Sequence, residues 1–137
     1  MSYATRSEMV ARFGAEEIDD LDTDDGVRIE SALADASAEI DAMISGLYTL
    51  PLPPGTYPAL RAIAVRIARE GLYDEDTPDA VTRAATQARS DLAALGDERA
   101  HLIDQSGAAV AQRRDDRAQI VGPDPVMTDE NFVGFNG

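Results

Sequence analysis

An amphipathic stretch that runs into a cluster of prolines, residues 27–54, constrains the fold more than any other feature. Its apolar residues recur at spacings of three and four, so they share one side of an α-helix. They are Ile29, Leu33, Ala36, Ile40, Met43, Ile44 and Leu47. Pro51 forbids continuation of the helix, because proline lacks a backbone N–H and clashes with the preceding turn. The stretch therefore predicts a long helix with one buried face and an abrupt end.

A short helix is predicted near the N-terminus. Thr5 and Glu8 have the spacing of a capping box, in which each side chain accepts a hydrogen bond from the other residue's backbone N–H. Gly14 ends this helix, and residues 16–21 add one or two turns. Residues 19–26 then form an acidic loop. A calcium loop of the EF-hand type requires a glycine and a glutamate at positions that this loop does not supply, so the loop is interpreted as a solvated helix cap.

Two more helices follow the prolines. Pro58 suits the first turn of a helix that reaches about residue 73, and this helix is apolar on two sides. A helix of that kind lies between two partners. Thr77 as the cap and Pro78 as the first residue begin the last helix, which Gly96 ends. The sequence thus predicts an all-α fold, a small bundle of about four helices over residues 1–96.

The second predicted part of the chain, residues 97–137, comprises a strand or linker region and an extended arm. Residues 101–103 suit a short strand before a turn at 104–107, and residues 108–119 are ambiguous between helix and disorder. The C-terminal end carries apolar residues among prolines and glycines, chiefly Met127, Phe132 and Phe135. Exposed apolar side chains usually mark a contact surface. The end is therefore predicted to dock on a partner or on a ring of its own copies, with a tail folded back onto its own domain as the alternative.

Composition limits the classes of function. Alanine is the largest share of the 44% hydrophobic residues, so the core of this 137-residue chain is thin and would gain from burial against a partner. The net charge of -14 argues against nucleic acid as a direct ligand, since such binding uses lysine and arginine. The absence of cysteine excludes disulfides and thiolate sites. No segment predicts a membrane span or a signal peptide, which indicates synthesis in the cytoplasm.

No pattern of catalytic or cofactor-binding residues is present in the sequence. The single histidine, His101, is not part of an HExxH pair, and there is no nucleophile elbow, phosphate-binding loop or dinucleotide fingerprint. Paired carboxylates are expected by chance among 26 acidic residues. We therefore predict no enzyme activity, no cofactor and no metal.

Two groups of residues are candidates for contacts with a partner, in addition to the C-terminal apolar residues. The proline segment fixes an extended path that fits a neighbour's groove or covers its own core. The crowded arginines of the helix after it form either an inter-subunit strip of ion pairs or local pairs, such as one between Arg66 and Glu70. The candidates are Leu50, Leu52, Pro54, Arg61, Arg66 and Arg69.

Three separated stretches resemble the phage Mu gp36-like family of small head-tail connector or neck proteins of tailed phages. They are YATRSEMVARFG at residues 3–14, ALADASAEIDAMISGLYTLPL at 32–52 and VMTDENFVGF at 126–135, with REGLYDED at 69–76 continuing the resemblance. The middle stretch is the most specific. Residues 96–122 depart most from the family pattern.

The resemblance implies an all-helical adaptor that forms a ring of about a dozen copies in the neck of the virion. Its partners would be copies of itself, the portal protein and a tail-side neck or tail terminator protein. DNA would pass through the ring without specific binding, and no membrane would be involved. The family has no catalytic residues to assign to this chain.

Two other classes of function remain open from the sequence. The acidic composition also suits a protein that mimics DNA and inhibits a host nucleic-acid enzyme. A generic helical binding module is the third interpretation, and it would stay monomeric at high concentration.

Overall fold

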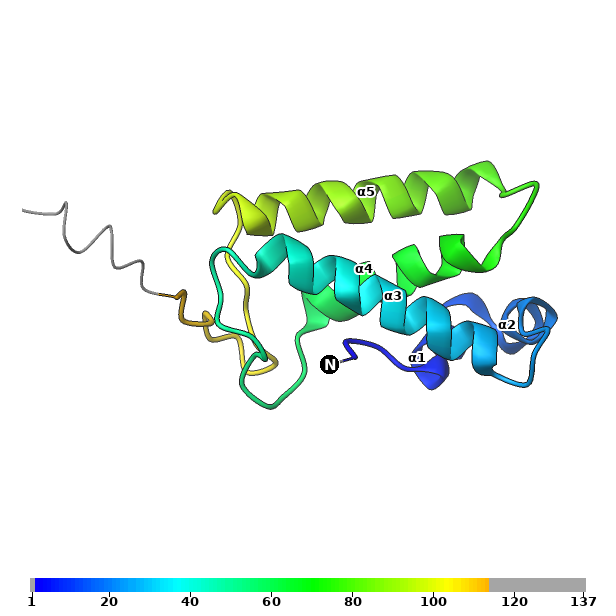
Figure 1. The fold of residues 1–137 in the computed structure, drawn as a ribbon, viewed down its shortest axis with the longest axis horizontal. Helices are drawn as coiled ribbons and strands as arrows, with labels where there is room; N and C mark the ends of the chain where they lie inside the picture. The colour runs from blue at the N-terminus through cyan, green and yellow to red at the C-terminus, as the bar shows by residue number, and fades with distance from the viewer. Residues whose placement is uncertain (1, 114–137) are drawn as a thin grey trace, which may run out of the picture.

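The computed structural model describes residues 2–113, which form five α-helices. The helices are α1 (Arg6–Phe13), α2 (Ala15–Leu21), α3 (Val27–Ile44), α4 (Pro58–Leu72) and α5 (Asp79–Gly96). The three long helices contact one another along the length of the molecule, α1 and α2 lie at one end, and the connections 45–57 and 97–113 gather at the other (Figure 1). The predicted all-α class is confirmed. The one or two turns expected after Gly14 are a separate helix, α2, which makes five helices in this part of the chain.

Five of the seven residues of the predicted apolar stripe are buried. Its buried members are Ile29, Leu33, Ala36, Ile40 and Ile44. Met43 is 45% exposed, and Leu47 lies beyond the helix end and is half-buried. Ser37 takes a buried place on the same helix, where its Oγ accepts a hydrogen bond of 3.1 Å from the Tyr3 backbone N–H. A polar residue on the inner face is tolerated because this bond satisfies it.

Helix α4 is buried on both of its apolar sides, as its pattern predicts. The buried residues are Leu60, Ile63, Ala64, Val65, Ile67, Ala68 and Leu72. It packs against α3, α5 and α1 of the same chain, and Gly71 near its end is exposed. Most of both apolar sides is thus covered by other helices of the same subunit.

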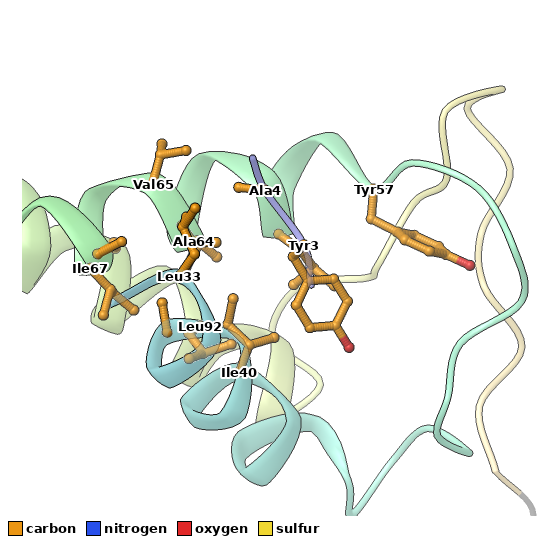
Figure 2. Close-up of a cluster of buried hydrophobic side chains, with 14 of the residues drawn as sticks. Tyr3, Ala4, Leu33, Ile40, Tyr57, Ala64, Val65, Ile67 and Leu92 are labelled. Atoms are coloured by element: carbon orange, nitrogen blue, oxygen red, sulfur yellow. The ribbon is translucent and has the colours of Figure 1, made fainter. Parts of the chain in front are cut away.

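The N-terminal segment closes the core between α3 and α4. Tyr3 and Ala4 belong to the buried cluster that includes Leu33, Ile40 and Ala64 (Figure 2). The Tyr3 hydroxyl donates a hydrogen bond to Asp41 Oδ1. Burial and the nearby Asp41 carboxylate both raise the pKa of the Tyr3 hydroxyl, because each disfavours the phenolate.

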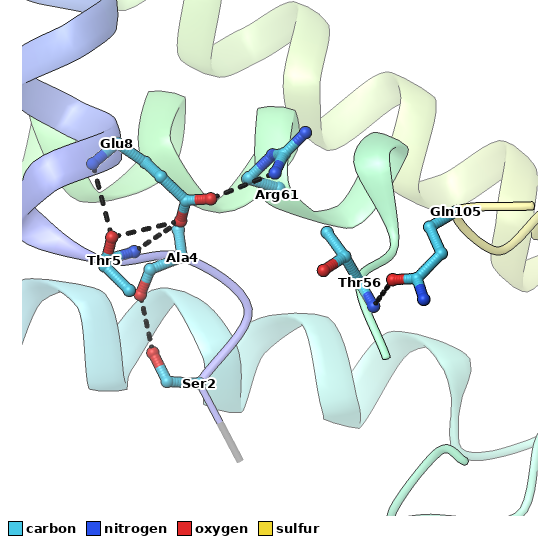
Figure 3. Close-up of polar contacts among 7 residues, drawn as sticks. All are labelled: Ser2, Ala4, Thr5, Glu8, Thr56, Arg61 and Gln105. Carbon is cyan, nitrogen blue, oxygen red and sulfur yellow. Dashed lines mark hydrogen bonds and ion pairs between the residues drawn. The ribbon is translucent and has the colours of Figure 1, made fainter. Parts of the chain in front are cut away.

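The predicted caps of α1 and the predicted end of α5 at Gly96 are confirmed, whereas the N-terminal cap of α5 differs from the prediction. The Thr5 N–H donates to Glu8 Oε1 at 2.8 Å and the Glu8 N–H donates to Thr5 Oγ1 at 3.3 Å, which confirms the capping box (Figure 3). Thr77 does not cap α5. Pro78 occupies the N-cap position with an extended ψ of 144°, so the first helical residue is Asp79.

Residues 97–113 contain a β-bridge in place of the predicted strand. Ile103 pairs with Ala109 in an isolated antiparallel bridge, and the turn between them matches the predicted turn at 104–107. Leu102 is fully buried, and its N–H donates to the Tyr48 hydroxyl at 3.3 Å. The segment after α5 therefore supplies a core residue to the helical bundle, although the sequence predicts a separate region there.

An ion pair joins α2 to α4. Arg69 donates to both Glu17 oxygens, at 2.7 and 2.8 Å, and the Tyr73 hydroxyl donates to Glu17 Oε2 at 2.8 Å. The Arg69 guanidinium also lies 4.2 Å from the centre of the Phe13 ring. The hydrogen bonds from Arg69 lower the pKa of Glu17, because they favour the carboxylate. This cluster fixes the short helices onto the long ones.

We expect Gly96→Ala to destabilise the protein. A Cβ at this position would lie 2.8 Å from the Met43 backbone oxygen, so α5 and α3 would have to separate. Overpacking of this kind costs about 1–3 kcal/mol. The control is Gly71→Ala in α4, where a Cβ meets no atom within 4 Å. Urea unfolding followed by circular dichroism should give a lower midpoint for the first variant and no lower midpoint for the second. Equal midpoints would contradict the close approach.

We expect the stabilising effect of Glu17 to depend on pH. Its pKa is lower in the folded chain than its ordinary value of 4.5, so its contribution is present at neutral pH and is lost as the pH falls below about 4.5. Glu17→Gln should reduce the free energy of unfolding at pH 7 by about 1–2 kcal/mol, since it removes a charged hydrogen-bond acceptor. The difference from the unmodified protein should shrink on acidification. Glu16→Gln, at an exposed neighbouring position, should show neither effect. A difference that stays constant down to about pH 3 would contradict the assignment.

Candidate interaction surfaces

The proline segment lies against the chain that follows α5. Leu52 is buried, Leu50 is half-buried and Pro54 is exposed. The Thr56 N–H donates to the Gln105 side-chain oxygen at 2.5 Å (Figure 3). The segment therefore covers its own core at Leu52, which was the alternative to docking on a neighbour, and it exposes Pro54.

A cavity of about 520 Å³ lies between the proline segment and residues 110–112. Its walls are Thr49, Pro51, Leu52, Pro53, Pro54, Val110, Ala111 and Gln112. Beyond it, Arg113 is held by its N–H, which donates to the Leu47 carbonyl at 2.5 Å, and by its guanidinium, which lies 3.3 Å from the Gly46 carbonyl. These bonds fix where the chain leaves the described part of the molecule.

Two of the three candidate arginines form ion pairs within the subunit. Arg61 lies 3.1 Å from Glu8 on α1 (Figure 3), and Arg69 pairs with Glu17 on α2. Both contacts are long-range in sequence, so the helical pattern of α4 alone did not identify these partners. Both pairs lie within the subunit, but neither is a pair along one helix of the kind given as the alternative to an inter-subunit strip.

Arg66 is placed differently from Arg61 and Arg69. Among residues 2–113 it has no ion pair with a carboxylate. The predicted partner, Glu70, instead lies 2.8 Å from Arg89 of α5, which also lies 2.8 Å from Glu39 of α3. The carboxylates favour the charged form of Arg89 and raise its pKa. Arg89 thus joins the three long helices and leaves Arg66 beside a groove.

That groove, which we call the α4–α5 groove, has a volume of about 300 Å³. It is lined by Ala59, Ala62, Ile63, Arg66, Asp91, Ala94, Leu95, Ala100 and His101. The groove is open because alanines on both helices have small side chains. Its charged residues, Arg66 and Asp91, lie among apolar residues. The groove could not be predicted from the sequence. The spacing of Ala59, Ala62 and Arg66 shows that they share a face, but not that this face is left open.

The remaining predictions concern the C-terminal apolar residues, a metal site and a membrane span. Met127, Phe132 and Phe135 lie outside the described residues. Within residues 2–113, no group of three or more metal-binding side chains is close enough together to hold an ion. None of the helices in the same part of the chain has the length and apolarity needed to cross a membrane.

The comparisons with known proteins identify a family. The family described as Bacteriophage Mu, Gp36 matches residues 3–120, which includes every described helix. The search of curated proteins gave no match. The family is of a phage structural type and has no evident enzymatic domain. Because the match extends over most of the sequence, this chain belongs to the bacteriophage Mu Gp36 family of phage proteins.

Proposed function

We propose that this protein is a head-tail connector subunit, which forms a ring of about a dozen copies between the portal vertex and the tail. The match to the Gp36 family over residues 3–120 is the observation that carries the proposal. The ring position follows from the resemblance of the chain to neck adaptors. In this role the protein contacts further copies of itself, the portal protein and a tail-side neck or tail terminator protein, and it resides in the virion neck.

The subunit has properties that suit such a ring. Its bundle is closed by its own helices, so it can fold before it assembles. Its net charge of -14 gives a ring lumen that repels the phosphate backbone, which favours passage of DNA without binding. Like-charged copies also repel one another. Contacts between copies therefore require apolar burial or charge pairing at defined places, and Pro54, Arg66 and the C-terminal residues Met127, Phe132 and Phe135 are our candidates.

The DNA-mimic alternative has less support. It requires a face of unpaired carboxylates spaced like phosphates. Several carboxylates instead pair with arginines of other helices, such as Glu8 with Arg61 and Glu17 with Arg69. Glu39 and Glu70 both pair with Arg89. These four carboxylates are therefore held by arginines and are not free to mimic phosphates.

We expect the protein to be a component of purified phage particles. Quantitative mass spectrometry should find it in a fixed ratio to the portal protein, because both would form closed rings in the same neck. Its absence from particles that contain the portal would reject the connector role. Such a result, together with capture of a nuclease or restriction enzyme, would favour the DNA mimic.

We expect removal of residues 123–137 to abolish the joining of heads to tails without unfolding the helical bundle. The truncated protein should keep its helical circular dichroism and its unfolding midpoint, because the five helices and their core lie within residues 2–113. It should fail to restore infectious particles in cells infected by a phage that lacks the gene. A folded truncated protein that restores tail attachment would remove the arm from the proposal.

A further inference from the structure

The α4–α5 groove has the features of a binding site for a short peptide segment. Ile63 and Leu95 lie beside the small side chains of Ala62 and Ala94 in its lining. A volume of about 300 Å³ is at the lower end of the range of roughly 300–1,000 Å³ for ligand pockets. A cavity of that size accepts one or two large side chains rather than a whole helix.

Charge at the groove selects the kind of segment. Arg66 is half-buried and has no carboxylate partner among the described residues, so it can pair with an acidic group that enters the groove. Asp91 and the exposed His101 are the other titratable groups of the lining. A cation beside an apolar floor favours a segment in which carboxylates adjoin large apolar residues.

We propose that the α4–α5 groove of one subunit binds residues 126–135 of a neighbouring subunit. The inference rests on the proposed ring and names one of its contacts. The segment has the sequence VMTDENFVGF, in which Asp129 and Glu130 closely precede Phe132. Its phenylalanines fit the apolar lining, and its carboxylates complement Arg66.

The length of the chain allows contact with a neighbour. Residues 114–125 separate the anchored Arg113 from the segment, and twelve residues span at most about 40 Å when extended. That distance exceeds the roughly 27 Å length of the longest helices at 1.5 Å per residue. The described chain ends at Arg113, in the same connection after α5 that contributes Ala100 and His101 to the groove.

Engineered disulfides test this contact directly, because the chain has no cysteine. One full-length variant carries Ala62→Cys in the groove, and a second, with a size tag, carries Asn131→Cys, which keeps both phenylalanines. The two variants are mixed at high concentration and oxidised, and they should form a mixed disulfide dimer. In the control mixture, Thr86→Cys on the exposed side of α5 replaces Ala62→Cys, and the yield of mixed dimer should be clearly lower. Mass spectrometry of the joined peptides identifies the bond.

The charge contribution has its own control. Arg66→Glu in the groove variant should lower the yield of the mixed bond several-fold, whereas Arg83→Glu, at an exposed arginine of α5, should leave it unchanged. A yield no higher than that of the Thr86→Cys control would overturn the inference. So would a bond found only within single chains of a double Ala62→Cys and Asn131→Cys variant. Neither result affects the proposed function, which depends on the presence of the protein in the neck.

Discussion

The burial of α4 between its neighbours is the interaction on which the rest of the structure depends. Its two apolar sides pack against α3 and α5, and the N-terminal Tyr3 belongs to the same core. Because alanine fills much of this interface, the helices pack closely, and Gly96 allows α5 to approach the Met43 backbone. Arg89 then connects α5 to carboxylates on both α3 and α4. These contacts among all three long helices stabilise the fold although the core is thin.

Features encoded by neighbouring residues could be predicted from the sequence. The capping box at Thr5, the break at Gly14 and the buried stripe of α3 each depend on contacts within a few turns of chain. Features that depend on distant segments could not. Arg69 and Glu17, which form an ion pair, are 52 positions apart in the sequence. Leu102 is buried, but the residues around it show no apolar periodicity that would predict its burial. Met43 shows the limit of periodicity, since a residue at the edge of a stripe is exposed when the facing helix ends nearby.

The candidate site follows the same division. The proline segment and the arginines could be identified as candidates from the sequence, but their contact partners could not. In the structure, Leu52, Arg61 and Arg69 make contacts within the subunit. The contacts that we propose with other molecules involve Pro54, the α4–α5 groove with Arg66, and the apolar C-terminal residues. A subunit that is closed in its core yet carries such features suits an assembly whose parts fold first and join later. In the ring that we propose, the acidic charge of the chain would favour passage of DNA without binding.

Cryo-electron microscopy of the neck in purified particles can show whether this protein is a connector subunit. We expect a closed ring between portal and tail that encloses an open channel and whose subunits fit the five-helix bundle. A neck whose density is fully explained by other proteins, with no position for this bundle, would contradict the proposed function.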